Sequence, residues 1–253
     1  MSTLDFIMDL FFPPTCLSCD ELQFPGTKVP LCPRCQQRWE ELRRQRCPDC
    51  KQLQTLCKCK PALLNNLSRN TECLHLVPYE QTNLAGRLIL IAKDERLPRL
   101  TAFFADQLQM AMAMRGVPTE SDELILTYLP RSKDRAREAG VDQSQALAKA
   151  LGTRLGMNVS DFFARKKAPP QKNLGATERL RSARRTYSLH KRCPSVQGKT
   201  VLLIDDVITS GATMLAGVEL LTAVGANRIY CITVGRSSKA DEYKKIAKCT
   251  KKC

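Results

Sequence analysis

The chain has 253 residues, of which 43% are apolar and 26% charged, a composition that predicts a globular protein of one or two domains and excludes a disordered one. Forty Lys and Arg against 25 Asp and Glu give a net charge of +15, which favours polyanionic partners such as nucleic acid, phosphorylated metabolites or an anionic membrane surface. No apolar run approaches the ~18 residues of a membrane helix, and residues 1–12 lack the basic start of a secretory signal, so we expect a cytoplasmic protein.

Three regions differ in composition and define the expected domains. Residues 1–62 hold closely spaced cysteines and show little regular periodicity. Residues 70–236 alternate apolar, strand-like runs with helical patterns. Residues 237–253 are a Lys-rich tail without an apolar face, which we expect to be solvated.

The middle region predicts an α/β fold. Its strand-like runs are residues 73–79, 124–129, 159–163, 201–204 and 228–234, with 159–163 expected as an edge strand. Its helical patterns are residues 84–92, 100–114, 144–155 and 213–223. Strands that alternate with helices indicate a parallel, doubly wound sheet with flanking helices.

Eight of the thirteen cysteines lie in the first 59 residues and form four closely spaced pairs. They are Cys16, Cys19, Cys32, Cys35, Cys47, Cys50, Cys57 and Cys59. Paired cysteines in a reducing compartment indicate metal ligands, and two pairs make a closed four-thiolate zinc site. We expect one or two structural zinc ions in a small, zinc-ribbon-like domain. Sequential pairing is the simplest topology, and a cross-braced arrangement remains open.

The alternatives for these cysteines are buried structural thiols or a redox C-x-x-C pair, which usually stands alone beside a βαβ unit. The second site is the weaker prediction, because its last pair is C-x-C. Closed sites leave no open metal position, so no catalysis is expected there. Cysteines without ligand spacing are expected in the core or the tail: Cys73, Cys193, Cys231, Cys249 and Cys253.

The strongest signal is the segment 201–213, VLLIDDVITSGAT. Its apolar run predicts a central strand, and Asp205 and Asp206 follow at the carboxyl end, where open α/β sheets bind ligands. Residues 209–213 are small and open a predicted helix, which suits a phosphate. Paired carboxylates suit ribose hydroxyls or Mg²⁺. A plain strand–turn–helix is the alternative, although two adjacent acids would repel each other there.

This segment resembles the fingerprint of the type I phosphoribosyltransferases, which bind phosphoribosyl pyrophosphate (PRPP) with Mg²⁺. The resemblance implies that Asp205 and Asp206 bind the ribose hydroxyls. It assigns the 5-phosphate to Thr209, Ser210, Gly211, Ala212 and Thr213. Thr209 stands where members that use 6-oxopurines carry an acid, which makes that substrate class less favoured. No Walker A motif occurs, so a nucleoside triphosphatase has no support.

Residues 131–192 carry sixteen Lys and Arg against five Asp and Glu, and so hold +11 of the net charge. In the phosphoribosyltransferase interpretation, the residues expected to face pyrophosphate or another anion are Arg131, Ser132, Lys133, Arg135 and Arg137. Gln171, Leu174 and Arg179 are expected in a mobile flap. The residues assigned to DNA or the flap are Lys93, Arg165, Lys166, Lys167 and Arg179. A solvated charged face is the alternative, and sparse aromatics predict mainly electrostatic, salt-dependent DNA binding.

The order of the motifs resembles the ComF family of competence proteins over nearly the whole chain. The motifs are the cysteine pairs, the segment from Tyr79 to Lys93, Pro130 to Gln143, Gln171 to Arg179, and the Asp205–Asp206 loop. The resemblance implies binding of single-stranded DNA and PRPP on the cytoplasmic side of the inner membrane, during DNA uptake in natural transformation. It implies an inner-membrane DNA channel or a helicase as protein partner, and peripheral contact with that membrane.

This chain departs from the family at Val141, Asp142 and Ala183, where the family usually has Phe, Asn and Asn. The loss of the aromatic side chain at Val141 argues against stacking there. Three hypotheses remain open: a competence factor, an active phosphoribosyltransferase acting on a base or amine, and a binding module whose old active site senses PRPP. A glutamine-dependent amidotransferase is not expected, because the chain does not start with a nucleophilic cysteine.

Overall fold

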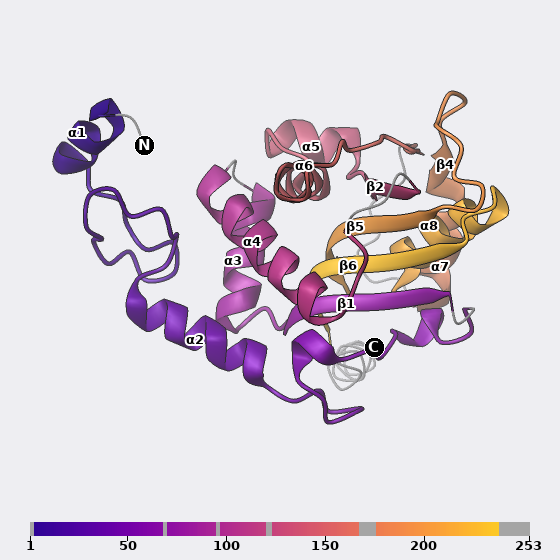
Figure 1. The fold of residues 1–253 in the computed structure, drawn as a ribbon, viewed down its shortest axis with the longest axis horizontal. Helices are drawn as coiled ribbons and strands as arrows, with labels where there is room; N and C mark the ends of the chain where they lie inside the picture. The colour runs from indigo at the N-terminus through magenta and orange to yellow at the C-terminus, as the bar shows by residue number, and fades with distance from the viewer. Residues whose placement is uncertain (1–2, 68–69, 95–96, 120–122, 167–175, 238–253) are drawn as a thin grey trace, which may run out of the picture.

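The central element of the molecule is a four-stranded parallel sheet (Figure 1). A computed structural model describes residues 3–67, 70–94, 97–119, 123–166 and 176–237. The strand order is β1 (Thr71–Pro78), β6 (Arg228–Arg236), β5 (Thr200–Ile208) and β2 (Leu124–Tyr128). All three neighbouring pairs are parallel, which confirms the expected α/β fold.

The two faces of the sheet are covered by different helices. Leu202 and Ile204 of β5 share one hydrophobic cluster with helices α3 (Leu84–Asp94), α4 (Pro98–Met114) and α6 (Gln143–Leu155). Val201 and Leu203 face a second cluster, which includes residues of α7 (Ala176–Thr186) and α8 (Ala212–Ala223). Alternate residues of a strand point to opposite faces, so an apolar run without polar interruption is what a doubly covered strand requires.

The carboxyl ends of three strands meet at one edge of the sheet. Arg236 of β6 is in register with Pro78 of β1 and with Ile208 of β5. The strand β5 continues through Asp205 and Asp206 to Ile208, four residues beyond the predicted run. The acid pair therefore lies near the ligand-binding edge of an open α/β sheet.

The cysteine-rich segment contains more regular structure than the sequence predicts. It holds α1 (Thr3–Phe11), α2 (Pro33–Arg44) and the short 3₁₀ helices η1 (Gln54–Leu56) and η2 (Ala62–Leu64). Trp39 of α2 is 1% exposed, and its ring centroid lies 5.3 Å from that of Phe103 and 5.7 Å from that of Phe104 on α4. The segment thus shares a hydrophobic core with the helices on one face of the sheet.

The prediction of an edge strand at residues 159–163 is wrong. Val159 makes only an isolated bridge to Leu126, and the strand in this region is β3 (Phe163–Arg165), which pairs antiparallel with β4 (Tyr187–Leu189). The reason is that both Phe162 and Phe163 are buried in the second hydrophobic cluster, which draws the chain away from β2.

Within the described part of the chain, no helix is both long enough and apolar enough to span a bilayer.

Candidate functional site

Asp205 and Asp206 have different partners, although they are adjacent on β5. The Ser144 hydroxyl donates to Asp205 Oδ1 at 2.9 Å, and the Asp206 backbone N–H donates to the same oxygen at 2.9 Å. Asp206 Oδ2 instead lies 3.2 Å from Nζ of Lys93, at the end of α3. The two carboxylates are therefore held by different helices, Asp205 by α6 and Asp206 by α3.

The electrostatics of the pair follow from burial and mutual repulsion. Burial, and next the charge of Asp206, raise the pKa of Asp205 to about 7, against the opposing effects of Ser144 and Lys93. Burial by itself would lower the pKa of Lys93, but the carboxylate of Asp206 outweighs it and the pKa is raised. Lys93 therefore stays protonated beside the acids at neutral pH.

A pocket of about 190 Å³ opens beside Asp205 at the start of α8. The residues that line it are Arg179, Asp205, Val207, Ile208, Thr209, Ser210, Gly211, Ala212, Thr213 and Met214. Gly211 has φ +83°, in the left-handed region, and a Cβ there would lie 2.9 Å from Leu64 Cδ1. The structure thus brings the predicted phosphate-loop residues together with one of the two acids, and adds Arg179 of α7.

A second group of polar contacts joins the predicted pyrophosphate loop to the acid pair. The Arg131 backbone N–H donates to Asp142 Oδ2 at 2.8 Å, and the Arg131 guanidinium donates to the carbonyl of Lys93. Asp142 also caps α6 by accepting from the Gln145 backbone N–H at 3.2 Å. Arg131 and Lys93 are therefore held side by side. Asp142, which stands where the ComF family usually has Asn, therefore holds the Arg131 backbone and caps α6.

The other predicted anion-binding residues are more scattered. Lys133 begins the short helix α5 (Lys133–Glu138), and Arg137 in the same helix is exposed. Ser132 accepts a backbone hydrogen bond from Ala136 at 2.9 Å. The side chains of Lys133 and Arg135 lie outside what the structure describes.

The residues assigned to DNA or a flap do not lie together. Lys93 lies at the acid pair, and Arg179 lines the pocket. Arg165 lies over the ring of Tyr187, 5.1 Å from its centroid, and donates to the carbonyl of Pro130 at 3.3 Å. Lys166 is exposed. The predictions for Lys167, Gln171 and Leu174 lie outside the described residues.

The paired cysteines form two clusters in sequential order. The first comprises Cys16, Cys19, Cys32 and Cys35, and the second comprises Cys47, Cys50, Cys57 and Cys59. Within each cluster the sulfur atoms all lie within 4.8 Å of one another, and the cross-braced alternative is not the arrangement found. Recorded Sγ–Sγ distances are 3.7 Å for Cys19–Cys32, 3.6 Å for Cys19–Cys35 and 3.6 Å for Cys50–Cys57.

These distances fit a tetrahedral zinc site. Four sulfurs at about 2.3 Å from a central zinc lie about 3.8 Å apart. Without metal the thiols of this cluster differ, because the Glu21 backbone N–H lowers the pKa of Cys19 to about 7 whereas burial raises the pKa of Cys32 to about 12, so the support for a metal site comes from the sulfur spacing. Both clusters therefore have the donor set and the spacing that a structural zinc ion requires.

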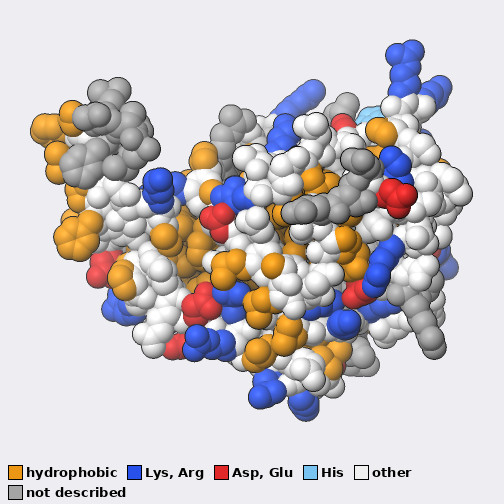
Figure 2. All heavy atoms as spheres, viewed as in Figure 1, with side chains coloured by type: hydrophobic (Ala, Val, Ile, Leu, Met, Phe, Trp, Pro, Cys, Tyr) orange, Lys and Arg blue, Asp and Glu red, His pale blue; other side chains and the backbone are white. Residues whose placement is uncertain are grey.

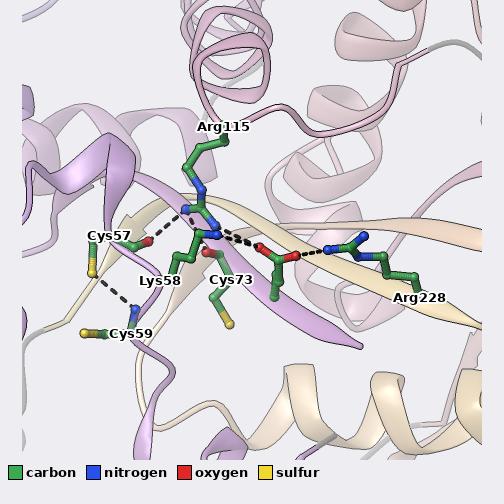
Figure 3. Close-up of polar contacts among 7 residues, drawn as sticks. Cys57, Lys58, Cys59, Cys73, Arg115 and Arg228 are labelled. Atoms are coloured by element: carbon green, nitrogen blue, oxygen red, sulfur yellow. Dashed lines mark hydrogen bonds and ion pairs between the residues drawn. The ribbon is translucent and has the colours of Figure 1, made fainter. Parts of the chain in front are cut away.

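Each cysteine cluster is held by arginines that are distant in the sequence, and no motif signalled them. The Arg99 guanidinium anchors the loop of the first cluster by donating to the carbonyls of Thr27 and Val29, each at 2.9 Å. Arg115, at the end of α4, donates to the carbonyls of Cys57 at 2.8 Å and Cys73 at 3.2 Å (Figure 3). Arg115 thereby ties the last cysteine pair to strand β1.

Beside this contact, Glu72 of β1 is surrounded by three positively charged side chains. It forms ion pairs with Arg228 and with Arg115, the latter at 3.4 Å, and a longer one with Lys58 at 3.9 Å. Burial opposes ionisation of Glu72, but Arg228 and the other cations lower its pKa. The carboxylate thus helps to fasten the second cluster to the sheet.

Comparisons with known proteins agree with the geometry of the pocket. Residues 139–253 match the phosphoribosyl transferase domain family. A ribose-phosphate pyrophosphokinase of Thermococcus kodakarensis is 32% identical over 83 residues, which are 33% of this chain and 24% of that protein. An adenine phosphoribosyltransferase of Mycolicibacterium smegmatis is 36% identical over 90 residues, which are 35% of this chain and 49% of that protein.

The chain therefore spans about a quarter and about half of the length of these two curated relatives. Among solved structures, a hypoxanthine phosphoribosyltransferase from Staphylococcus aureus superposes with a TM-score of 0.36 and 14% identity, covering 54% of this chain and 62% of that one.

Proposed function

We propose that this chain, whose residues 139–253 match the phosphoribosyl transferase domain family, binds PRPP with Mg²⁺ in the pocket between β5 and α8. The observation that carries the proposal is the position of Asp205, which lines the same pocket as residues 209–213. A carboxylate beside a loop of small residues at a helix N-terminus matches a sugar with a terminal phosphate.

In this proposal, different residues bind the 5-phosphate, the ribose and the pyrophosphate of PRPP. Backbone N–H groups of Thr209 to Thr213 receive the 5-phosphate, because the start of α8 presents unpaired donors and the positive end of its dipole. The carboxylates of Asp205 and Asp206 accept from the ribose hydroxyls. Arg131, held against the backbone of Lys93, supplies positive charge for pyrophosphate. Mg²⁺ neutralises the phosphates when it is bound.

We further propose that the protein is a ComF-type competence factor that binds single-stranded DNA on the cytoplasmic side of the inner membrane. The supporting surface lies on β3, α7 and the loop after β4. Its exposed cations, none with an acidic partner among the described residues, are Lys166, Arg181, Arg185, Lys191 and Arg192. Lys and Arg side chains project from the end of the molecule that carries β4 (Figure 2). This basic surface adjoins the pocket through Arg179 of α7.

The two cysteine clusters are proposed to hold structural zinc, with their sulfurs closed around each ion. Such a segment suits docking to a protein partner, for which a DNA channel or a helicase of the inner membrane is the candidate that the ComF resemblance supplies.

The second candidate function is an active phosphoribosyltransferase. The observation that favours it is the 36% identity over 90 residues to an adenine phosphoribosyltransferase. In such a reaction a base or amine forms the new bond to the ribosyl C1 while the bond to pyrophosphate breaks, and pyrophosphate leaves as its magnesium complex. Catalysis would consist of positioning and electrostatic stabilisation.

The test has two stages. Calorimetry with PRPP and Mg²⁺ is expected to show binding by the wild type and none by the folded Asp205→Asn/Asp206→Asn double variant, and equal affinities would overturn the site assignment. A strain deleted for the gene is then complemented with each form. Loss of transformation in the deletion strain, restored only by the wild type, supports a competence role through the pocket. Normal transformation in the deletion strain would refute that role and move the transferase to first place.

An assay of pyrophosphate release further distinguishes the competence factor from the active phosphoribosyltransferase. Wild-type protein is assayed with PRPP, Mg²⁺ and a panel of nucleobases and amines. Turnover that the double variant lacks would establish the transferase, whereas PRPP binding without turnover supports the competence factor.

A further inference from the structure

We propose that the second cysteine cluster braces the phosphate loop, so that metal bound there, and not metal in the first cluster, sets the affinity for the phosphorylated ligand. The positioning residue is Arg236, whose side chain reaches the cluster while its backbone lies beside the loop. The identity of the ligand rests on the proposed function, but the brace itself is a property of the fold.

The side chain of Arg236 is enclosed by the second cluster. It is 5% exposed, and its Nη2 lies 3.1 Å from Asp49 Oδ2, inside the Cys47–Cys50 turn. Its Nη1 lies 3.9 Å from Sγ of both Cys47 and Cys57. Four thiolates around Zn²⁺ carry a net charge of −2, which a guanidinium with several donors in a fixed plane is suited to stabilise.

The backbone of Arg236 leads directly to the phosphate loop. Arg236 is in register with Ile208, the residue before Thr209, and the Ser237 backbone N–H donates to the Ile208 carbonyl at 3.0 Å. On the other side, the Tyr79 backbone N–H donates to the Arg236 carbonyl at 2.8 Å. A shift of Arg236 therefore moves the end of β5 from which the loop departs.

A second connection runs through the chain that leaves the cluster. Two residues after Cys59, Pro61 and the turn to Leu64 pack over the N-terminus of α8, and Leu64 is fully buried. A Cβ at Gly211 would lie 2.9 Å from Leu64 Cδ1 and 3.1 Å from Pro61 Cβ. The close fit means that this turn supports the loop residue that must adopt positive φ.

The first cluster has no comparable route to the pocket. Cys16, Cys32 and Cys35 belong to the hydrophobic cluster that contains Trp39 and α4, on the opposite face of the sheet from most of α8. Its loop is anchored by Arg99, at the start of α4. Among the described residues, no recorded hydrogen bond or ion pair joins the first cluster to residues 208–214.

Arg115 ties the second cluster to β1 from outside, but the loop of the cluster has little internal structure that would keep its shape without metal. Between Cys47 and Cys59 the regular structure consists of η1, a single 3₁₀ turn. In such a loop the metal–thiolate bonds supply much of the folding free energy. Loss of the ion leaves the Arg236 guanidinium without its thiolate partners and frees the turn that covers Gly211.

The test compares matched ligand variants, Cys50→Ser in the second cluster and Cys19→Ser in the first. Both cysteines are half-buried, so the substitutions are similar in kind. Each protein is purified under zinc-replete conditions, and its zinc content is measured. Hydrogen exchange at residues 208–214 is recorded without ligand, and PRPP affinity is measured with Mg²⁺ by calorimetry.

Cys50→Ser is expected to speed exchange in the loop and to weaken PRPP binding by about tenfold, whereas Cys19→Ser changes neither. Arg236→Lys, compared with Arg99→Lys, repeats the test with all eight ligands intact. It retains the positive charge but loses the planar group that contacts Asp49 and both sulfurs. We expect Arg236→Lys to speed exchange at residues 208–214 with zinc still bound.

The outcomes separate the inference from the proposed function. If holo wild type does not bind PRPP, the proposed function fails, but faster loop exchange in Cys50→Ser and Arg236→Lys alone still supports the brace. If the second cluster of Cys50→Ser has lost its zinc and exchange in the loop is unchanged, the brace is overturned. Equal effects of Cys19→Ser and Cys50→Ser would also overturn it. If Cys50→Ser fails to fold, the arginine pair decides by the same criteria.

Discussion

Nζ of Lys93 on α3 lies 3.2 Å from Asp206 Oδ2 on β5, and this ion pair gives the two adjacent acids different surroundings. Asp206 faces a protonated amine, whereas Asp205 lines the pocket and accepts from the Ser144 hydroxyl. Without the amine, two neighbouring carboxylates at a buried strand end would repel each other with less compensation. Lys93 therefore offsets part of the repulsion within the pair, although Asp205 still holds a proton up to about pH 7.

Replacement of this amine tests its role. Lys93→Met is expected to weaken PRPP binding by about tenfold, because a charge-assisted hydrogen bond to a buried carboxylate is lost. Lys93→Arg, which keeps the charge, should restore part of the affinity. The control is Lys149→Met, at an exposed position of α6. Unchanged affinity of Lys93→Met by calorimetry would contradict the assignment.

The raised pKa of Asp205 predicts a specific pH dependence of stability. The folded protein holds a proton on Asp205 up to about pH 7, whereas the unfolded chain releases it near pH 4. Stability contributed by this group is thus lost as pH rises between these values, and is constant above about 7. Asp205→Asn removes the effect, so its stability relative to wild type should increase from pH 5 to pH 8 by roughly 3 kcal/mol, about 1.4 kcal/mol for each pH unit between 5 and 7.

Urea denaturation of the two proteins at both pH values measures this difference, and contributions that wild type and variant share cancel. A difference in the free energy of unfolding that does not change with pH would show that Asp205 titrates normally.

Zinc removal should be visible through the single tryptophan of the chain. Trp39 is 1% exposed and lies on α2, the helix that begins in the Cys32–Cys35 turn. Cys32→Ser is expected to lower the zinc content from two ions to about one per chain and to shift Trp39 emission to longer wavelength as the ring is exposed. Elemental analysis that finds less than one zinc in the wild type would refute the metal assignment.

The basic surface predicts the salt dependence of DNA binding. Log affinity for single-stranded DNA is expected to fall with log salt by about 0.7 for each phosphate neutralised. Arg181→Ala/Arg185→Ala should therefore reduce the slope and weaken binding at low salt. Replacing Arg44 and Arg46, exposed in the cysteine-rich segment, provides a charge-matched control. Equal slopes for all three proteins would place the DNA elsewhere.

The sequence predicted most of the sheet because β5 and β6 are continuous apolar runs that both faces of the sheet bury. It predicted the phosphate loop because Asp205, Asp206 and residues 209–213 are adjacent in the chain. Residues that are adjacent in the chain stay neighbours in the folded protein, so a site built from them can be predicted from the sequence. The prediction of a strand at 159–163 was wrong because a contact distant in the chain decided the structure. Burial of Phe162 and Phe163 in the second hydrophobic cluster outweighed pairing with β2.

The sequence of helix α2 contains few apolar residues, so a helix was not predicted there. Its buried residues are Cys35, Trp39 and Arg43, and the rest of its sequence is strongly polar. Helix α7 likewise carries five charged residues among its eleven, and its buried apolar residue is Ala183. Such helices are recognised from tertiary packing rather than from periodicity.

The contacts of Lys93 and Arg236 were beyond sequence analysis for a different reason. Lys93 was expected at a DNA surface or flap, but it meets Asp206 because α3 ends beside the carboxyl edge of the sheet. Arg236 meets Asp49 and the second cysteine cluster although they lie at opposite ends of the described chain. No spacing rule links residues so far apart, and only the strand order brings them together.

That strand order also constrains how the protein is made. The strand β1 finds its partner in β6, with Thr71 opposite Ile229, so β1 stays unpaired on the ribosome until β6, more than 150 residues later, has been synthesised. The cysteine segment emerges before the sheet and is able to capture metal early, yet its arginine partner arrives among the last residues of the sheet. A nascent chain thus exposes a strand edge prone to aggregation for most of its synthesis, and ribosomal stalling before residue 228 would leave it unprotected.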